Sequence, residues 1–456
     1  MKPAYDTVLE VLPSLSLREL VTIKANAAGR DDKDDPFYIV NVGNILKKHK
    51  TWLSLLPRVE PFYAVKCNDD RNVLATLSAL GIGFDCASMA EIKAVLKLGV
   101  PPSKIVYANP CKQASHLKFA AKREVSMMTF DNEPELHKVK QLHPTAKLIL
   151  RLLTDDSKSL CRLGQKYGAP LKTVPNLLQV ARNLDLNVVG ISFHVGSGCY
   201  DASAFSSAVE IAKTAFDYGK SMGFQFDILD IGGGFPGSPR ATVSFEEISA
   251  TLNKALNKHF PVESGVRIIA EPGRYYVASA FNLAVNVIAK RQVNDDNTQA
   301  QDRNVDNKNV KKALTQKYMY YVNDGVYGSF NCLLYDHAIV YPKTLGRDNE
   351  QQYSSSIWGP TCDGLDCVMK ECMLPELDVG DWMYFEDMGA YTAAAASNFN
   401  GFQKPLAYYV IEEKVWNRLN GILPMPFHFE RKSDNHFLQQ INRLCIVGAD
   451  SHLVKE

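Results

Sequence analysis

Several polar residues of this chain directly follow apolar, strand-like runs, and their types could do chemistry. Lys66 ends such a run in PFYAVKCNDD, and His194 ends another in ISFHVGSGC. EPGR places Glu271 and Arg274 on one turn, and DIGGGFPG offers three glycines from Gly232 onward. Each stretch alone has an ordinary explanation: a solvated lysine, a satisfied histidine, a local ion pair and a tight turn. Only their combination points to a site.

Together these stretches carry the groups that one ligand needs. Glycines let backbone N–H groups approach a phosphate closely, and Ser197 and Arg274 can bind it as well. An imidazole can lie against a flat ring, a carboxylate can face a ring nitrogen, and a lysine can form a Schiff base with an aldehyde. Pyridoxal 5′-phosphate (PLP) has all of these parts. The sequence therefore predicts a PLP site in which Lys66 binds the aldehyde. The glycines fit neither GxGxxG nor the Walker pattern, so a nucleotide is not implied.

These residues need a scaffold that brings strand ends together. From about residue 58 to 275, eight β-rich runs alternate with amphipathic helical stretches. The runs are apolar at consecutive positions, as strands covered on both faces are. We predict an α/β fold with a closed (β/α)8 TIM-type barrel, in which function collects at the C-terminal ends of the strands. The polar residues expected at those ends are Lys66, Asp85, Arg151, His194, Gly232–Gly234 and Glu271–Arg274.

The pattern changes after the barrel. Runs such as YMYYVND and DWMYFEDMG are β-like and joined by turns, which predicts a mainly antiparallel β domain. We expect residues 42–280 to form the barrel, and residues 1–41 and 281–456 to form the β-rich domain. The strand-like DPFYIVNV precedes the barrel, and the sequence leaves open whether it pairs with the C-terminal domain. The polar segment 291–316 predicts a flexible loop.

Composition excludes several classes of protein. The chain has 456 residues, enough for two or three domains; 46% are hydrophobic, and 51 Lys and Arg balance 50 Asp and Glu. No overall charge favours nucleic acid or an anionic membrane, and no apolar run is long enough for a signal peptide or a membrane span. The ten cysteines are scattered without CxxC. We therefore expect reduced thiols in a cytoplasmic protein, with neither a disulfide framework nor a metal site.

Over most of its length the sequence resembles the eukaryotic ornithine decarboxylase family. Members of that family are fold-type III PLP enzymes with an alanine-racemase-like barrel and a C-terminal β domain. The resemblance runs from about residue 5 to 420. It is carried, in the family's order, by PFYAVKCND, GFDCASMAEI, YANPCKQ, LRLLTDDSKS, FHVGSGC, LDIGGGFPG, EPGRYYVASAF, NDGVYGSFNCLLYDH, WGPTCDGLD and GDWMYFEDMGAYT.

The resemblance implies a role for each matching residue. The implied catalytic residues are Lys66, His194, Glu271 and Cys362. The implied cofactor-binding residues are Lys66, Asp85, Arg151, His194, Ser197, Gly234, Glu271, Pro272, Gly273, Arg274 and Tyr391. The implied substrate contacts are Tyr335, Asp336 and Asp363. Within these sets, Lys66 matches the PLP lysine, His194 the residue stacked on the ring and Glu271 the partner of the pyridinium nitrogen. Cys362 and Asp363 match residues that reach the site from the other subunit of a homodimer.

The residue chemistry agrees with these roles. Asp336 and Asp363 are two acceptors for a distal ammonium, so the substrate should be a diamino acid. A thiol such as Cys362 is a suitable acid for returning a proton to Cα after CO2 has left. The expected reaction is the PLP-dependent decarboxylation of L-ornithine to putrescine, the first step of polyamine biosynthesis.

Two alternatives stay open. One is a paralogue with a shifted specificity, for example for lysine. The other is a non-catalytic relative that binds antizyme, and KQASHLKFAAKREVSMMTFDNEPELHK resembles the antizyme-binding element of the family, which would serve either class. The presence of Lys66, Asp85, Cys362 and the other matching residues favours an active enzyme. The tail from Phe427 lacks the acidic, Pro/Ser/Thr-rich composition of many vertebrate members, so we expect no rapid tail-driven turnover.

Overall fold

The computed structural model describes residues 7–13, 16–30, 33–294, 316–347, 349–419 and 428–431. The loop predicted at 291–316 lies outside these ranges except at its ends, where residues 291–294 continue a long strand and residue 316 begins another. The tail for which we predict no rapid turnover also lies outside them, apart from 428–431. The chain forms two compact units, of which one contains residues 44–278 and the other the described residues before and after it.

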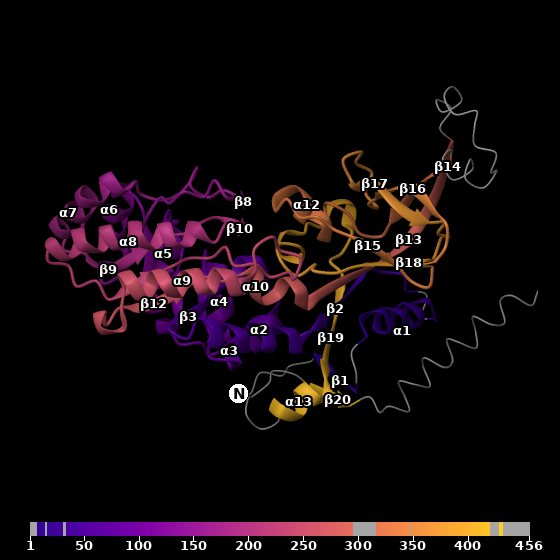
Figure 1. Ribbon diagram of the computed structural model, residues 1–456, viewed down its shortest axis with the longest axis horizontal. Coiled ribbons are helices and arrows are strands. Elements are labelled where there is room, and N and C mark those ends of the chain that lie inside the picture. The colour runs from indigo at the N-terminus through magenta and orange to yellow at the C-terminus, as the bar shows by residue number, and fades with distance from the viewer. Residues whose placement is uncertain are drawn as a thin grey trace, which may run out of the picture. The chain divides into compact units, whose positions relative to one another are not determined.

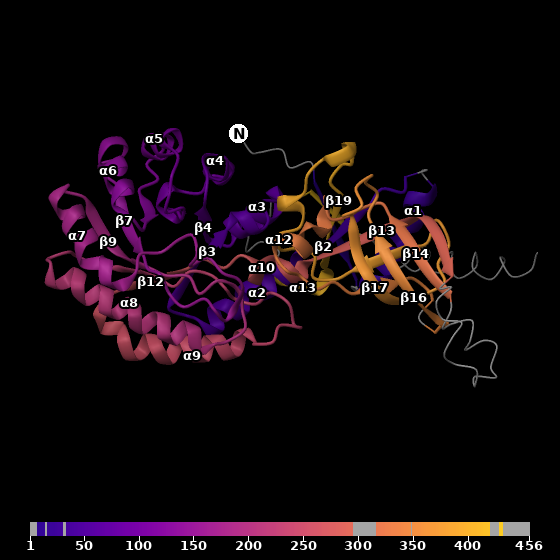
Figure 2. The same cartoon turned by 90° about the horizontal axis from the view of Figure 1, so that it is seen from above.

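The first unit is a closed barrel of parallel strands (Figures 1 and 2). Its strands, in the order in which they pair around the barrel, are β11 (Ile228–Asp230), β12 (Arg267–Ala270), β3 (Val59–Ala64), β4 (Gly83–Cys86), β5 (Ile105–Tyr107), β6 (Met127–Phe130), β7 (Lys147–Arg151) and β9 (Asn187–Ser192). All eight correspond to the β-rich runs of the sequence. The prediction of a TIM-type barrel is therefore confirmed.

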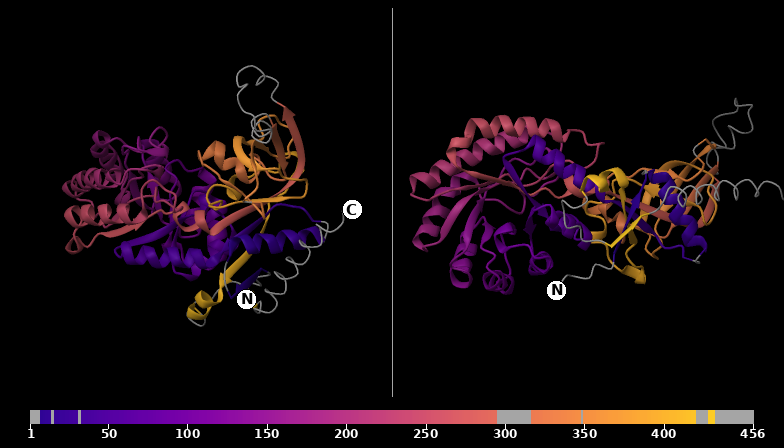
Figure 3. Two further views of the ribbon diagram at one scale, coloured as in Figure 1. Left: turned by 45° about the vertical axis from the view of Figure 1, so that its right-hand side comes forward. Right: turned by 90° about the horizontal axis from the view of Figure 1, so that it is seen from below.

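Helices occupy the connections between the barrel strands. They are α3 (Arg71–Ala79), α4 (Met89–Lys97), α5 (Ala114–Lys122), α6 (Glu133–Leu142), α7 (Val174–Asn183), α8 (Ser203–Ser221) and α9 (Phe245–His259), and a further helix, α2 (Val42–Leu55), precedes the first barrel strand, β3. Asp70, Ser88, Asn132 and Ser244 cap four of them, because each side chain accepts a hydrogen bond from the first turn. The long helices α8 and α9 lie side by side on the outside of the barrel (Figures 2 and 3). No helix in the described part of the chain is long and apolar enough to cross a membrane.

The barrel is filled by side chains rather than open. One buried cluster takes a single residue from each of seven strands: Phe62, Val106, Met127, Ile149, Val189, Ile228 and Ile269. Glycine makes room where the strands approach most closely. A Cβ on Gly83 would come within 2.6 Å of the Phe62 ring. Because the interior is packed, a ligand can approach only at the ends of the strands, where the loops are.

The second unit is built on a ten-stranded sheet. Its strands are β1 (Val8–Leu12), β2 (Phe37–Asn41), β13 (Phe281–Asn294), β14 (Gln316–Val322), β15 (Pro342–Thr344), β16 (Gln352–Trp358), β17 (Cys367–Pro375), β18 (Trp382–Phe385), β19 (Leu406–Glu412) and β20 (His428–Arg431). The pairs β13–β14, β13–β2, β13–β18, β15–β18 and β16–β17 are antiparallel, as predicted. The pairs β14–β16, β2–β19, β1–β19 and β1–β20 are parallel.

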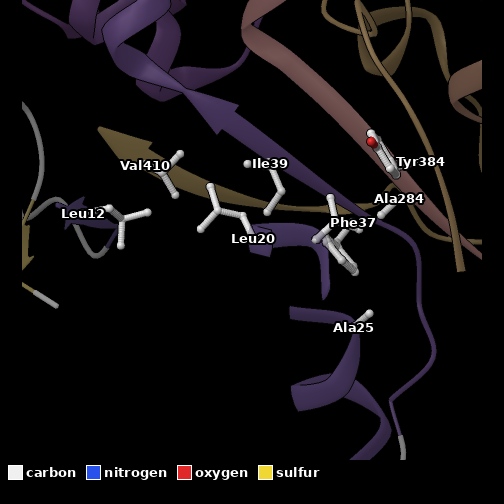
Figure 4. Close-up of a cluster of buried hydrophobic side chains, with 9 residues drawn as sticks. Leu12, Leu20, Ala25, Phe37, Ile39, Ala284, Tyr384 and Val410 are labelled. Carbon is white, nitrogen blue, oxygen red and sulfur yellow. The ribbon is translucent and has the colours of Figure 1, made fainter. Parts of the chain in front are cut away.

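The N-terminal strands complete this sheet. DPFYIVNV, whose pairing the sequence left open, forms β2 and lies between β13 and β19. Helix α1 (Leu17–Arg30) covers this part of the sheet and buries Leu20, Val21 and Ala25 against it (Figure 4). The sheet contributes Leu12, Phe37, Ile39, Ala284, Tyr384 and Val410 to the same cluster. Segments from both ends of the chain therefore share one core.

We expect Gly190→Ala to destabilise the barrel. Gly190 lies in β9, and a Cβ there would come within 2.0 Å of the Ile228 carbonyl oxygen on β11. Backbone atoms cannot move away without opening the barrel, so the free energy of unfolding should fall by about 2 kcal/mol or more. Urea unfolding followed by circular dichroism measures this. Gly29→Ala is the control, because a Cβ at that helical position has nothing within 4 Å; equal stability of both variants would contradict the expectation.

Candidate active site

Lys66 lies at the mouth of the barrel. Strand β3 ends at Ala64, two residues earlier than the sequence suggested, and Lys66 follows on the 3₁₀ turn Val65–Cys67 (η1). Its Nζ forms an ion pair with Asp85 Oδ2 from the neighbouring strand β4. The Lys66 side chain is 41% exposed, whereas that of Asp85 is fully buried. Burial raises the pKa of the Asp85 carboxyl, and Lys66 and Arg151 oppose that rise. An accessible amine is thus held by a buried carboxylate.

His194 follows strand β9 and is neutral at pH 7. Burial lowers its pKa well below the usual value, and the cations Arg151 and Lys66 act in the same direction. The Nδ1 atom accepts a hydrogen bond from the Gly196 backbone N–H at 3.0 Å. Because Nδ1 is an acceptor, the neutral ring carries its proton on Nε2. The imidazole is therefore fixed in orientation and carries no charge, as a residue stacked on an aromatic ring should be.

Three loops pack against one another at the mouth of the barrel, and glycines allow their backbones to approach closely. They follow β9, β11 and β12 and carry Gly196, Gly232–Gly237 and Glu271–Arg274 respectively. A Cβ on Gly234 would come within 2.7 Å of the Gly196 carbonyl oxygen, and Gly234 has a φ of +106°. A Cβ on Gly237 would come within 2.0 Å of the Arg274 carbonyl oxygen. Where the loops meet, Arg274 Nη2 donates to Ser197 Oγ at 2.7 Å. A cation, a hydroxyl and a glycine turn whose backbone N–H groups a phosphate can approach closely together form a cradle suited to phosphate, here called the phosphate-type cradle.

Glu271 carries a buried carboxyl, and one of its oxygens can accept a hydrogen bond from a ligand. The side chain is 7% exposed, and Oε1 has no hydrogen-bond partner among the described residues. Burial raises its pKa well above the usual value, and the nearby carboxylates of Asp230 and Asp85 raise it further. Lys66 and Arg151 only partly oppose this rise. Such a carboxyl is suited to share a proton with a bound base.

The rest of the Glu271 loop packs against the Lys66 turn. The Ala64 backbone N–H donates to the Pro272 carbonyl oxygen at 3.1 Å. A Cβ on Gly273 would come within 2.9 Å of Cys67 Cβ. The structure thus brings together the ten site residues that the sequence placed in the barrel: Lys66, Asp85, Arg151, His194, Ser197, Gly234, Glu271, Pro272, Gly273 and Arg274.

Comparison with known proteins identifies the family. A family model described as "Pyridoxal-dependent decarboxylase, pyridoxal binding domain" matches residues 42–278. Ornithine decarboxylase of Rattus norvegicus is 56% identical over 407 residues, which cover 89% of this chain and 87% of that protein. The chain belongs to the ornithine decarboxylase family. The resemblance inferred from the sequence is confirmed, and so is PLP as the cofactor.

Other members of this family differ in activity. Antizyme inhibitor 2 of Xenopus laevis is 51% identical over 401 residues, which cover 88% of this chain and 86% of that protein. The arginine decarboxylase of Paramecium bursaria Chlorella virus matches in structure with a TM-score of 0.77 at 36% identity, covering 85% of this chain and all of that one. Family membership therefore fixes the fold and the cofactor more firmly than it fixes the substrate.

The barrel residues fit the PLP cofactor of the family. Lys66 has an exposed amine for the aldehyde, and Ser197 and Arg274 form a cradle for the phosphate. Glu271 offers a carboxyl oxygen for the ring nitrogen. Gly233 keeps the space between the Glu271 carbonyl oxygen and His194 Nε2 open, since a Cβ there would come within 2.8 Å of both. No residue of the predicted set contradicts the cofactor.

The other five predicted site residues belong to the second unit. Tyr335 ends helix α12 (Cys332–Tyr335) and is 71% exposed, whereas the following Asp336 is 6% exposed. Cys362 and Asp363 lie on the loop between β16 and β17, and the Cys362 thiol is exposed. Tyr391 has a φ of 55°, in the left-handed region. The roles that the resemblance gives these five residues stay predictions.

The Asp363 carboxylate is oriented by its neighbours. Its Oδ2 accepts a hydrogen bond from the Tyr327 hydroxyl, and its Oδ1 accepts one from the Leu365 backbone N–H at 2.9 Å. These bonds lower the pKa of Asp363, so the group is ionised at neutral pH. The Cys362 backbone N–H donates to Asn400 Oδ1 at 3.0 Å. The loop therefore presents a carboxylate and a thiol in a defined arrangement.

Sequence reasoning missed Asp366, which fixes this loop. The carboxylate is buried and accepts hydrogen bonds from the Val326 N–H at 2.8 Å, the Thr361 N–H at 3.0 Å and the Thr361 hydroxyl at 2.7 Å. It also fills the space that a Cβ on Gly325 or Gly359 would occupy, 2.1–2.2 Å away. Asp366 thus ties the Tyr327 loop to the Cys362 loop. The sequence feature that could have revealed Asp366 is an aspartate within an otherwise apolar stretch, LDCVM.

Sequence reasoning also missed Ser159. The short strand β8 (Ser159–Cys161) pairs with β10 (Ser197–Cys199), so the segment after β7 lies across the loop that carries His194 and Ser197. Ser159 Oγ donates to the Val195 carbonyl oxygen at 2.6 Å. A Cβ on Gly196 would come within 2.6 Å of Ser159 Cβ. The stretch LRLLTDDSKS carries part of the family resemblance, but nothing in its composition shows that it forms a strand with a distant loop.

We expect Gly233→Ala to weaken PLP binding while the fold is kept. Gly233 has an ordinary φ, so a Cβ brings no backbone strain and acts only through the space it takes between Glu271 and His194. Overpacking of this size should lower the affinity for PLP by about tenfold or more. Titration of the cofactor-free protein with PLP, followed by fluorescence, measures this. Gly364→Ala is the control, since nothing lies within 4 Å of its Cβ, and unchanged affinity in Gly233→Ala would remove the ring from this place.

Proposed function

We propose that this chain decarboxylates L-ornithine to putrescine and CO2 with PLP as its cofactor. The observation that carries the proposal is the arrangement at the barrel mouth. An exposed amine, a neutral imidazole, a phosphate-type cradle and a buried carboxyl with a spare oxygen lie on neighbouring strand ends. The substrate is proposed from the paired acceptors Asp336 and Asp363, which suit a distal ammonium.

The barrel residues would act by holding the cofactor and its protons. Bound PLP supplies an electron sink for the pair of electrons that remains on Cα when CO2 leaves. Lys66 Nζ would hold the aldehyde end, and Ser197 and Arg274 the phosphate. Glu271 would keep a proton at the ring nitrogen, which makes the ring a better acceptor of electrons. His194 would cover one face of the ring and exclude water, and its neutral state avoids a second cation beside it.

The residues of the β-rich domain would select the substrate and protonate the product carbon. Asp336 and Asp363 would bind the distal ammonium of ornithine, with Tyr335 beside them. Cys362 would give a proton to Cα, because a thiol is a stronger acid than water and the exposed Sγ is accessible. We propose that residues 42–280 bind the cofactor. Residues 1–41 and 281–456 would carry these substrate groups and the dimer interface.

We propose a homodimer with shared active sites, in which Cys362 and Asp363 serve the partner's barrel. The product, putrescine, places the reaction at the start of polyamine biosynthesis. A cytoplasmic location agrees with the scattered cysteines, of which those in the described residues are free. Binding of antizyme is proposed from the stretch 112–138, which forms α5, β6 and part of α6.

A second candidate is a non-catalytic protein that binds antizyme. Its support is the 51% identity to antizyme inhibitor 2 of Xenopus laevis. Against it stands the complete set of barrel residues, which a protein without PLP chemistry would not need. A decarboxylase with shifted specificity, for lysine or arginine, would keep the same barrel mouth and change the Asp336 and Asp363 loops.

One experiment separates these candidates. Purified protein is incubated with PLP, its visible spectrum is recorded, and CO2 release is measured from ornithine, lysine and arginine. We expect a cofactor band that borohydride abolishes and release that is fastest with ornithine. A colourless protein that does not take up PLP would favour the antizyme-binding candidate. Fastest release from lysine or arginine would favour the shifted enzyme.

We expect Asp363→Ala to raise KM for ornithine by about tenfold or more. Removal of the carboxylate leaves the distal ammonium with one acceptor fewer. The variant should also discriminate less against amino acids without a distal amine. Steady-state kinetics with ornithine and norvaline measure both effects. Glu371→Ala is the control, since Glu371 is exposed on β17 away from the Cys362 loop; equal ornithine kinetics in Asp363→Ala and the parent would remove Asp363 from the substrate pocket.

We expect Lys66→Ala and Cys362→Ala to complement each other. Each variant alone should be nearly inactive. If Cys362 serves the partner's barrel, a heterodimer of the two has one site with both defects and one site with neither. Random pairing of equal amounts gives half heterodimers, so about one quarter of the parental activity should return.

Co-expression with two different affinity tags isolates the heterodimer for this test. Its specific activity should be about half that of the parent, since one of its two sites is intact. Demonstrated heterodimers with no more activity than the single variants would show that each site lies within one subunit.

A further inference from the structure

Asp230 is a buried carboxyl that the proposed mechanism does not use. It is the last residue of β11, directly before the three glycines, and its exposure is 0%. Oδ1 accepts a hydrogen bond from the Gly232 N–H at 2.9 Å, and Oδ2 accepts one from Ser192 Oγ at 3.1 Å. The same carboxyl is hydrogen-bonded to the Glu271 side chain.

A closed set of bonds keeps Asp230 and Glu271 together. The Glu271 backbone N–H donates to the Gly232 carbonyl oxygen at 2.6 Å, and the Gly232 N–H donates to Asp230. Gly232 has a φ of +63°, and a Cβ there would come within 2.1 Å of the Phe193 carbonyl oxygen. The turn therefore cannot shift, and the two carboxyls stay in contact.

The charges around this pair come from four strand ends. Glu271 faces Asp230 on β11, Asp85 on β4, Lys66 after β3 and Arg151 on β7. Asp230 faces Glu271 and Asp85, with Ser192 and the Gly232 N–H as its neutral partners. Two carboxyls in contact cannot both ionise without a large cost, so such pairs hold one proton between them.

The proton belongs to Glu271. Burial raises the pKa of Asp230, but its bonds with Gly232, Glu271 and Ser192 hold it at about 6. Burial and the two neighbouring carboxylates raise the pKa of Glu271 well above its usual value. The pKa of Glu271 therefore has the stronger causes for a rise, and of the two carboxyls Glu271 holds the proton more firmly. Removing the charge of Asp230 removes one of the two repulsions, so the proton affinity of Glu271 should fall.

We propose that Asp230 is a positioning residue that keeps a proton on Glu271 and thereby delivers it to the ring nitrogen of bound PLP. The proton moves from the Glu271 carboxyl to the ring nitrogen, and no electrons are exchanged. The product is an ion pair between the Glu271 carboxylate and the ring N–H⁺. The Asp230 carboxylate, fixed beside Glu271, would favour that cation as well. This inference requires PLP binding, which the family establishes, but not turnover of ornithine.

A purely structural role makes a different prediction. If Asp230 only holds the Gly232 turn, an asparagine would serve as well, because its carbonyl oxygen can accept the same N–H. Asp230→Asn therefore keeps the bond from the Gly232 N–H and removes the charge, and its amide NH2 can donate to Ser192 Oγ where the carboxylate accepted from it. Ser192→Ala does the reverse, since it removes one hydrogen bond and leaves the charge.

The test uses PLP labelled with ¹⁵N in the ring and bound to the full-length protein without substrate. The ¹⁵N chemical shift reports directly whether the ring nitrogen is protonated, and it is followed from pH 6 to 9. We expect the midpoint of protonation to fall by about one pH unit or more in Asp230→Asn, the size expected for the loss of a neighbouring charge. Ser192→Ala should shift it by less than half of that. An unchanged midpoint in Asp230→Asn would overturn the proposal, whatever its effect on ornithine turnover.

A second measurement does not depend on Asp230→Asn folding. The infrared spectrum of the cofactor-free parent at pH 7 is compared with that of Glu271→Gln, both checked by circular dichroism. We expect a protonated-carboxyl band in the parent that Glu271→Gln lacks. If the two spectra do not differ in that band, Glu271 holds no proton for the cofactor and the proposal is wrong.

Discussion

The candidate site depends on the close approach of three backbone loops at the mouth of the barrel. The loops after β9, β11 and β12 touch through Gly196, Gly232–Gly234 and Gly237, where a Cβ would come within 2.0–2.8 Å of a backbone or side-chain atom. Because these contacts leave no space, the loops cannot move independently. His194, Ser197, Glu271 and Arg274 are carried on them, so their relative positions are set by the backbone and not by the side chains themselves. A cofactor can then be bound without reorganisation, which is what makes preorganised sites effective.

Electrostatic balance is the second constraint on the mouth. Two cations, Lys66 and Arg151, face the buried carboxyls of Asp85 and Glu271, and a third buried carboxyl, Asp230, lies beside these two. Burial raises the pKa of all three carboxyls. Lys66 and Arg151 oppose that rise at Asp85 and Glu271, and hydrogen bonds oppose it at Asp230. Burial keeps His194 neutral, and the same two cations act in the same direction. One buried proton therefore remains where a ring nitrogen can take it. Arg274 lies outside this cluster and donates to Ser197, so these two residues would hold the anionic phosphate of PLP.

The sequence predicted the barrel and most of the mouth because both leave local signals. Alternating β-rich and amphipathic runs gave all eight strands, and polar residues at strand ends gave Lys66, Asp85, Arg151 and His194. Asp230 was hidden, because in FDILDIGGG it reads as a strand residue beside a turn. Ser159 and Asp366 act through contacts between segments distant in sequence, for which no local pattern exists. The parallel pairs of the second sheet were missed for the same reason. β1 and β2 come before the barrel and β19 after it, so their pairing is decided only when the whole chain has folded.

The loops of the β-rich unit are fixed in their own way, by buried carboxylates. Asp324 accepts the backbone N–H groups of Gly325 and Ser329 at 2.8 and 2.9 Å, and Asp366 accepts those of Val326 and Thr361. Burial raises the pKa of Asp324 to about 6, so its ionised form costs stability at neutral pH, and its hydrogen bonds define the shape of the loop in return. Tyr327 and Asp363 lie three residues from Asp324 and Asp366, and their contact is therefore set inside this unit. A change at Asp324 or Asp366 therefore acts on Asp363 through contacts within this unit. With Asp363 in the substrate role proposed for it, the choice of substrate could vary through these loops while the residues of the barrel mouth stay the same.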